Sequence, residues 1–303
     1  MWWRERPLLA GFLLIGGLVA AFLVVVWAGS SAGALRGPGR VAVVEITGVI
    51  VDAGETVQAL RRHAKDRSVR AVVLRIDSPG GGVGASQEIY EEVERLRTRA
   101  GKTVVASMGA VAASGGYYIA LAADRIVANP GTITGSIGVI VQLFNLEGLG
   151  EKVGVRATVI KSGPFKDIGS PARPLTEEDR RILQGVVDDV YEQFVAAVRE
   201  RRGLSEAEVR RLADGRILSG RQAKAAGLVD RLGNLWTAIH EAAELAGIPG
   251  EPVVLFPEKP RLSLLDLLTG RALAGLERRL STAALPGLLT GQTMRLSYLL
   301  LLP

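Results

Sequence analysis

The sequence predicts an α/β domain in which a largely parallel sheet is covered by helices. Apolar, β-branched segments alternate with segments of helical pattern along the chain, which is typical of such a sheet. About 220 residues separate the apolar N-terminal region from a change of composition that begins at Arg261, and this length suits one domain. We therefore expect a start and anchor over residues 1–35, the main domain over 36–250, and an amphipathic and apolar extension over 251–303.

The N-terminal region is long and apolar enough to span a membrane. Pro7–Leu35 contains no charged residue, and Leu8–Trp27 is almost wholly apolar. About 20 apolar residues cross a bilayer core, whereas the apolar part of a cleaved signal peptide is about 7–15 residues long. We therefore expect one retained transmembrane helix, with a cleaved signal peptide and a buried soluble helix as the alternatives. Arg4 and Arg6 precede the apolar run and favour a cytoplasmic N-terminus and an extracytoplasmic domain.

The first half of the domain has the pattern of three strands with helices between them. Apolar, β-branched segments predict strands at Val41–Ile46, Ala71–Ile76 and Thr103–Ser107. Between them, helical patterns predict helices at Thr56–Lys65 and Ser86–Arg99. Because a helix separates each strand from the next, we expect the strands to pair in parallel.

Shorter segments complete the predicted domain. Two apolar segments predict short strands, Ile126–Ala128 and Ala157–Ile160. Thr176 and Asp179 have the spacing of an N-cap pair and predict a helix that runs to about Arg202. The remaining segments of helical pattern are Tyr117–Ala123 and Ser205–Leu212.

Composition narrows the chemistry that the chain can perform. It contains no cysteine, and its two histidines, His63 and His240, have no neighbouring serine or metal-ligating partner in the sequence. No phosphate-binding or dinucleotide-binding glycine motif is present, so we expect no metal site and no cofactor. The formal charge of +6 is not gathered into a stripe, so we expect no nucleic-acid binding.

A serine and a lysine are the remaining candidates for nucleophilic catalysis. A serine nucleophile needs a base, and lysine can serve if burial keeps it neutral. Ser114 lies in the small-residue run Val111–Ile119, and Lys166 follows 52 positions later. Each also has an ordinary interpretation, because serine is a common N-cap residue and most lysines are solvated. Only seven of the 37 basic residues are lysine. In a chain that otherwise uses arginine, a lysine is more often required as such, because arginine cannot be deprotonated.

A glycine-rich turn follows the predicted strand that ends at Ile76. Gly81 and Gly82 lie in Val72–Gly84, where a backbone free of side chains could aim N–H groups at an oxyanion. An ordinary turn at the exit of a strand would satisfy the same pattern.

Four motifs occur in an order that resembles the signal peptide peptidase A family, in its short, single-domain bacterial form. The resemblance covers about Arg40 to Ile248 and implies an α/β, ClpP/crotonase-like fold with repeated β-β-α units. The motifs are Asp77–Gly82 (DSPGGG), Ala113–Tyr118 (ASGGYY), Thr134–Val139 (TGSIGV) and Lys161–Asp167 (KSGPFKD).

The resemblance assigns a role to each candidate residue. It implies that Ser114 is the nucleophile, that Lys166 is the general base and that Ser136 hydrogen-bonds the lysine. Lys161 is a competing base, and only the family pattern rejects it. We expect Asp167 to point away from Lys166, because a facing carboxylate would keep the lysine charged. The implied backbone sites are the oxyanion-hole donors Gly81 and Gly115, and Gly82 at the substrate-binding edge.

The same resemblance implies a function. It predicts a membrane-anchored serine endopeptidase of peptidase family S49 with a Ser-Lys dyad that degrades hydrophobic peptides, above all cleaved signal peptides. It also implies a homo-oligomeric ring, commonly an octamer, in which neighbouring subunits contribute the serine and the lysine. The alternatives are a membrane-bound Ser-Lys protease with a specific regulatory target, an acyl-CoA enzyme of the same fold, and a non-catalytic membrane scaffold.

The end of the sequence resembles the peptides that such an enzyme would cut. Arg295–Pro303 is rich in leucine, and a tethered ligand has a high effective concentration. We expect that this segment can occupy an active-site groove, its own or a neighbour's, and be trimmed there. The alternative is that the leucines pack against another subunit or the membrane.

Overall fold

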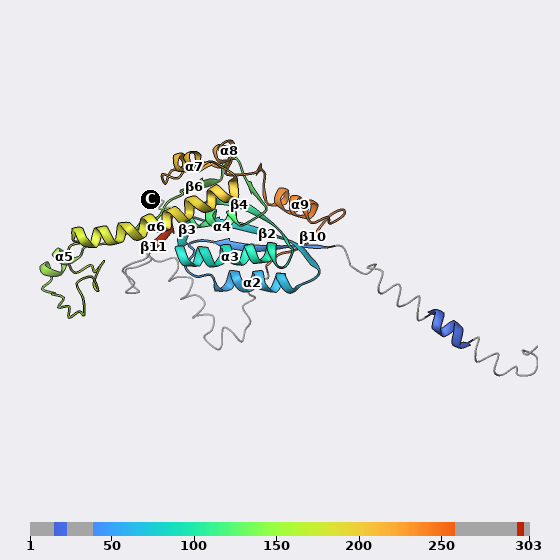
Figure 1. Cartoon of the computed structure of the whole chain (residues 1–303), viewed down its shortest axis with the longest axis horizontal. Helices are drawn as coiled ribbons and strands as arrows, with labels where there is room; N and C mark the ends of the chain where they lie inside the picture. The colour runs from blue at the N-terminus through green and yellow to red at the C-terminus, as the bar shows by residue number, and fades with distance from the viewer. Residues whose placement is uncertain (1–14, 23–38, 258–295, 300–303) are drawn as a thin grey trace, which may run out of the picture. The chain divides into compact units, whose positions relative to one another are not determined.

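The computed structural model describes residues 15–22, 39–257 and 296–299 (Figure 1). Residues 15–22 form a short exposed helix in a unit separate from the domain that starts at Arg40. Most of the predicted transmembrane run lies outside the described residues, as does most of the predicted extension over 251–303. Within the described ranges, no helix combines the length and the apolar character that membrane crossing requires.

The domain is built on a sheet whose central strands are all parallel. Neighbouring strands pair in register, so that Val72 lies beside Val104 and Val43 beside Val73. The main path of the sheet is β10 (Val253–Leu255), β1 (Arg40–Thr47), β2 (Val69–Ser78), β4 (Thr103–Ala113), β5 (Arg125–Ala128) and β9 (Arg231–Leu232). Two further strands extend it: β6 (Ile133–Gly135), parallel to β4, and β8 (Ile217–Ser219), antiparallel to β6.

Both faces of the sheet are buried, as expected for parallel strands between helices. Along β1, Ala42 and Val44 belong to the larger apolar core, whereas Val41 and Val43 belong to a smaller core on the other face. The larger core is closed by α2 (Gly54–Lys65), α3 (Val83–Thr98), α4 (Gly115–Leu121) and α6 (Glu177–Arg202), and the smaller core by α9 (Leu235–Leu245). The remaining helices are α5 (Glu147–Lys152), α7 (Glu206–Leu212) and α8 (Gly220–Ala225).

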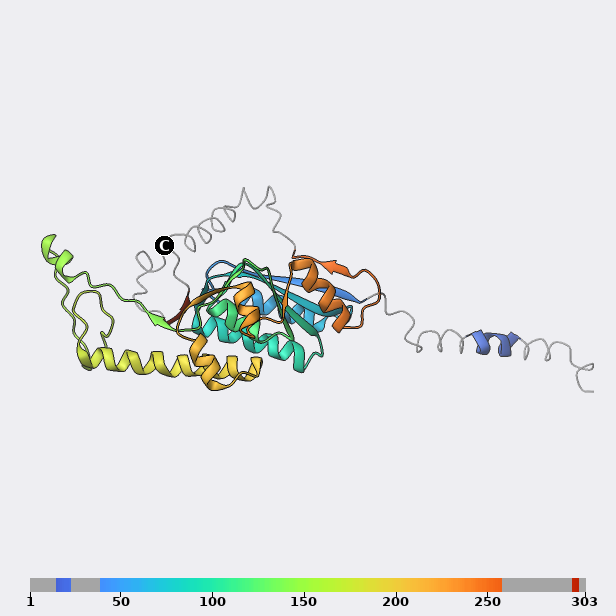
Figure 2. The same ribbon diagram turned by 90° about the horizontal axis from the view of Figure 1, so that it is seen from above.

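Helix α6 is anchored to the domain through its C-terminal half only. Val190, Val195 and Val198 are buried, and the ring of Phe194 packs edge to face on Tyr118 of α4 at 5.1 Å between centroids. The N-terminal half extends beyond the sheet, and the segment that contains α5 lies at its far end in both views (Figures 1 and 2). We call residues 142–189 the arm.

The sequence predicted most of these elements, with one wrong strand. Thr176 and Asp179 form a reciprocal capping box, and the helix they open ends at Arg202 as expected. Ala157–Ile160, predicted as a strand, has no regular structure. The segment belongs to the arm, where Ile160 is 98% exposed, so its β-branched residues have no neighbouring strand or core to pair with.

Candidate active site

Three chain segments converge at the edge of the sheet where β2, β4 and β6 end. β2 leads into β3 (Gly80–Gly82), β4 leads into Ser114, and β6 leads into Ser136. Because these strands are parallel neighbours, their carboxyl ends meet at one edge: Ser78 pairs with Ala112, and Ala113 pairs with Gly135. The structure therefore brings together the glycine turn, the candidate nucleophile and the candidate third polar residue.

Ser114 sits in a strained turn between β4 and α4. Its φ of 53° and ψ of −118° lie in a region that residues with a side chain rarely adopt. The turn is fixed by its backbone, since its N–H donates to the carbonyl of Gly135 (2.9 Å) and its carbonyl accepts from the N–H of Tyr118 (2.8 Å). Its hydroxyl does not cap α4, so the ordinary N-cap interpretation is wrong for this serine. A serine held in a strained strand-to-helix turn is the arrangement of a nucleophile elbow.

Ser136 shares this unusual backbone. Among the described residues, Ser114 and Ser136 are the two positions other than glycine with positive φ, and Ser136 has a φ of 50°. Its N–H donates to the carbonyl of Arg216 (2.7 Å), and the residue is almost fully buried. Strain of this kind persists where the surrounding structure enforces it and is concentrated at functional sites. No sequence pattern predicts a positive φ at a serine, so the backbone strain of Ser114 and Ser136 is seen only in the structure.

The glycine turn is clamped by Ile50, a residue that the sequence did not single out. The N–H of Ile50 donates to the carbonyl of Gly80, and its carbonyl accepts from the N–H of Gly82, both at 2.8 Å. The N–H of Gly81 therefore faces the other side of the strand, because backbone groups alternate along β structure. Gly115 is the first residue of α4, where an N–H has no acceptor within the helix. Both backbone groups suit an oxyanion hole.

We expect Gly81→Ala to destabilise the domain and Gly82→Ala to leave its stability near that of the wild type. A Cβ on Gly81 would lie 2.1 Å from the carbonyl oxygen of Ile50, whereas at Gly82 the nearest atom would be 3.7 Å away. Forced overpacking costs about 1–3 kcal/mol of unfolding free energy. Chemical denaturation of the two variants measures the difference, and equal stability would show that the contact with Ile50 does not constrain the turn.

Lys166 is exposed and belongs to the arm, which projects beyond the sheet (Figures 1 and 2). The structure of one subunit therefore does not bring the predicted serine and lysine together. The adjacent Asp167 is held by Arg173 (2.9 Å) and Lys161 (2.7 Å). Hydrogen bonds from Arg173 and then Lys161 hold the pKa of the Asp167 carboxyl well below its usual range. Asp167 is thus bound by two other cations, and Lys161 is committed to an ion pair.

Arg173 also fixes the junction of the arm with α6. Its guanidinium donates to both carboxylate oxygens of Asp179, at 2.5 and 3.3 Å. These bonds, together with those from Thr176, lower the pKa of Asp179 to about 2. The loop that carries Lys166 is therefore tied through Arg173 to the first turn of α6.

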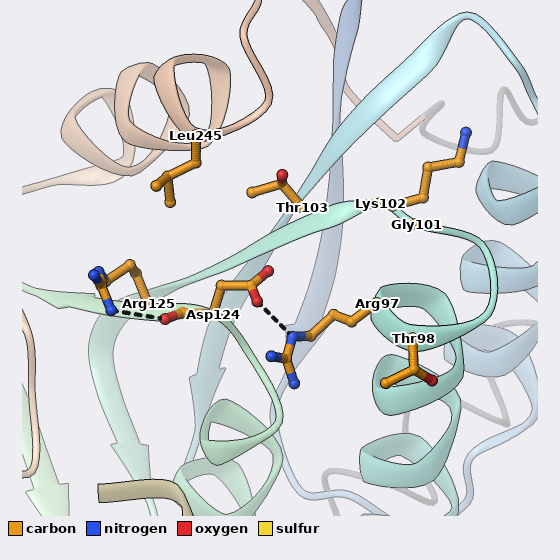
Figure 3. Close-up of a pocket in the computed structure, with 8 residues that line it drawn as sticks. All are labelled: Arg97, Thr98, Gly101, Lys102, Thr103, Asp124, Arg125 and Leu245. Carbon is orange, nitrogen blue, oxygen red and sulfur yellow. Dashed lines mark hydrogen bonds and ion pairs between the residues drawn. The ribbon is translucent and has the colours of Figure 1, made fainter.

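A pocket of about 520 Å³ lies at the opposite end of β4 (Figure 3). Thr103, which begins β4, lines it, whereas Ser114 follows the end of the same strand. Asp124 occupies one wall and is already bound by Arg97 (2.7 Å) and by the N–H of Val104 (2.8 Å). The pocket is therefore separate from the candidate active site. Within the part of the chain that the structure describes, no cluster of acidic or histidine side chains could hold a metal ion.

Comparison with known proteins shows that the sequence is similar to proteases. The sequence model of peptidase family S49 matches residues 97–249. A “Putative protease” of Synechocystis sp. is 47% identical over 76% of this chain and 83% of its own length. “Protease 4” of Salmonella typhi is 36% identical over 77% of this chain and 39% of its own length. A “Putative signal peptide peptidase SppA” of Enterococcus faecium is 37% identical over 64% of this chain and 60% of its own length.

Proposed function

The chain belongs to peptidase family S49, the signal peptide peptidase A family, and we propose that it hydrolyses hydrophobic peptides with Ser114 as its nucleophile and Lys166 as its base. Membership makes it a serine protease with a mixed α/β fold around a central sheet. The observation that carries the assignment of the nucleophile is the strained backbone of Ser114, next to the glycine turn.

The proposed mechanism follows from the groups at this sheet edge. The Oγ atom of Ser114 attacks the peptide carbonyl as Lys166 accepts its proton, and the N–H groups of Gly81 and Gly115 stabilise the oxyanion. Lys166 then delivers the proton to the leaving amine, and water hydrolyses the acyl-enzyme. Ser136 hydrogen-bonds the lysine amine and directs it toward Ser114, and Gly82 forms the edge along which the substrate lies.

We propose that Lys166 acts on Ser114 of a neighbouring subunit. The arm that carries Lys166 extends from the domain, so a second copy is the direct source of a lysine at the sheet edge. A neighbouring subunit would also bury Lys166, and burial is what makes a lysine neutral enough to act as a base.

The surface of the arm supports this assembly. Its apolar side chains are exposed to an extent that is unusual for a monomer and typical of a protein interface. A closed ring, such as an octamer, gives every subunit the same two contacts and leaves no arm unpaired. The exposed apolar residues of the arm are Phe144, Leu146, Leu149, Val153, Val155, Val159, Ile160, Phe165, Ile182 and Val186.

The proposed substrates are peptides at a membrane. The apolar run Leu8–Trp27 would anchor the chain with its N-terminus in the cytoplasm and its catalytic domain outside. Signal peptides released there are apolar and lie close to the anchor. A protease of the same type with one regulatory target is the second candidate, because the anchor serves it equally well. An acyl-CoA enzyme of the same fold is disfavoured by membership of a peptidase family.

A fluorophosphonate probe tests the assignment of the nucleophile. We expect the probe to label the protein once, at Ser114, since only an activated serine reacts. Ser114→Ala should lose both labelling and peptide hydrolysis, whereas Ser68→Ala, a change at an exposed serine, should retain both. Peptide mapping identifies the labelled residue, and labelling at another serine, or an active Ser114→Ala variant, would refute the assignment.

A further inference from the structure

Five exposed arginines lie at or just before the amino ends of the four central strands. The strands β1, β2, β4 and β5 are parallel neighbours, so their starts lie at one edge of the sheet, opposite to the edge that carries Ser114. Neighbouring strands are about 4.8 Å apart, which places the four starts within about 15 Å of each other. We call these five residues the basic edge: Arg40, Arg67, Arg70, Arg99 and Arg125.

The fold leaves the charge of the basic edge unneutralised. Arg40 and the segments 66–70, 99–103 and 124–125 contain six basic residues and two acidic ones. Asp66 accepts bonds from the N–H and the hydroxyl of Ser68, both at 2.8 Å, and Asp124 is bound by Arg97 at 2.7 Å. Among the residues that the structure describes, none of the five arginines forms an ion pair. The edge is therefore a surface of net positive charge.

The helix macrodipole does not account for this grouping. A cation is favourable at the C-terminus of a helix, and Arg67 and Arg99 follow α2 and α3 closely. Arg40, Arg70 and Arg125 instead occupy the first or second residue of a strand, and the dipoles of strands are small. Like charges gathered on one surface repel each other. Their grouping therefore indicates a partner of negative charge.

The pocket at this edge is too small a target for that partner (Figure 3). Two of its three cations are used by the fold: Arg97 binds Asp124, and the amine of Lys102 donates to two backbone carbonyls at the start of β2, at 2.8 and 2.5 Å. For Arg125 the described residues provide one bond, to the carbonyl of Asp124 at 3.4 Å. The other four arginines of the basic edge lie outside the pocket. A partner that reaches all five is an extended anionic surface.

We propose that the basic edge docks the domain on a membrane surface that contains anionic lipid headgroups. This inference rests on the proposed anchor. Only residues 28–39 separate Trp27 from Arg40, and these 12 residues span at most about 40 Å, so the anchor holds the basic edge near the lipid. Arginine binds phosphate through two parallel N–H···O bonds, and basic residues next to a membrane span are attracted to anionic lipid. Docking turns the edge that carries Ser114 away from the lipid, because the two edges lie at opposite ends of β4.

Fluorescence quenching in the full chain tests the proposal. The chain contains no cysteine, so one introduced cysteine carries one dye. Ser68→Cys places the dye at the exposed loop of the basic edge. Gly131→Cys places it beyond the opposite end of β5, where an added Cβ meets nothing within 4 Å. In nanodiscs with nitroxide-labelled headgroups, we expect strong quenching at position 68 when phosphatidylglycerol is present and weak quenching in phosphatidylcholine alone. Position 131 should be quenched weakly in both.

Removing charge from the basic edge should release the domain from the lipid. Each arginine near an anionic surface strengthens binding about fivefold, so Arg67→Gln with Arg99→Gln should lower the ratio of docked to free domain by about 25-fold. The matched control is Arg211→Gln with Arg221→Gln, which removes two exposed arginines of α7 and α8 and should leave the ratio unchanged. Thermal unfolding of both double variants verifies that they are folded.

Several outcomes would overturn the proposal. These are equal quenching at position 68 in the two lipid compositions, undiminished quenching after loss of Arg67 and Arg99, and stronger quenching at position 131 than at position 68. Binding of a DNA duplex by the full chain in detergent, without quenching in phosphatidylglycerol discs, would assign the basic edge to nucleic acid instead. A chain that does not enter the discs would refute the anchor, and docking with it.

Peptide hydrolysis by the same discs keeps the inference separate from the proposed function. Discs that cleave a fluorogenic peptide but show no quenching at position 68 would overturn docking and leave the peptidase assignment in place. Discs that show the expected quenching but no hydrolysis would refute the peptidase assignment and support docking.

Discussion

Replacing Lys166 by arginine should inactivate the peptidase as completely as replacing it by alanine. A guanidinium stays protonated at any pH at which the protein is folded, so it cannot accept the proton of Ser114. Loss of a nucleophile or its base typically lowers kcat on the order of 10⁴-fold or more. We therefore expect Ser114→Ala, Lys166→Ala and Lys166→Arg to lose peptidase activity to the same extent. Initial rates on a fluorogenic apolar peptide measure this loss.

Lys161→Ala is the matched control for this result. Lys161 lies in the same motif, and its Nζ atom donates to Asp167 at 2.7 Å and to the carbonyl of Pro164 at 3.0 Å, so it serves the loop's own contacts. Asp167 retains Arg173 at 2.9 Å in this variant, so the loop keeps one of its two ties. Lys161→Ala should therefore retain most of the activity. Full activity in Lys166→Arg would remove Lys166 from the mechanism, and an inactive Lys161→Ala with an active Lys166→Ala would reverse the assignment.

Mixed assemblies of two inactive variants should regain activity. In Ser114→Ala subunits the lysine is intact, and in Lys166→Ala subunits the serine is intact. If the two groups meet across a subunit contact, equal mixing leaves about one quarter of the sites with both, since each partner is drawn independently around a symmetric ring. We therefore expect about a quarter of wild-type activity, compared with none in either variant alone.

The experiment requires that the two chains share one assembly. Co-expression with two different affinity tags, followed by purification on both, isolates such assemblies. Combining the two variants after each has assembled separately provides the control and should give no recovery before subunits exchange. If doubly tagged assemblies remain inactive, the serine and the lysine of a working site belong to a single subunit, which would require the arm to fold back onto its own domain.

The sequence predicted the central domain because its signals are local. Val41–Val44 and Ala71–Leu74 are continuous apolar runs, as expected for strands buried on both faces, and both lie within strands of the structure. Thr176 and Asp179 marked the start of α6 through a capping box, in which each side chain bonds a backbone N–H three residues away. The same local reasoning failed at Ala157–Ile160, because a β-branched segment becomes a strand only where a partner edge receives it.

The part of the candidate site that follows from the parallel order of the strands could be predicted from the sequence. Gly81 and Ser114 follow neighbouring parallel strands, so their meeting at one edge follows from the order of the strands. The positive φ of Ser114 and Ser136 was not predictable, because it depends on tertiary hydrogen bonds such as those to Gly135 and Arg216. The exposed position of Lys166 was also beyond local reasoning, because its motif does not show whether the loop that carries it packs on the domain.

The projecting arm has a consequence for when the enzyme becomes active. The arm that carries Lys166 projects beyond the sheet (Figures 1 and 2). If the proposed dyad spans two subunits, a newly synthesised subunit is inactive until it meets a second copy. Activity would then rise more steeply than protein concentration at low abundance and fall sharply on dilution. If the proposed anchor holds the subunits in a membrane plane, it would raise the rate of these encounters and restrict proteolysis to the place where the subunits accumulate.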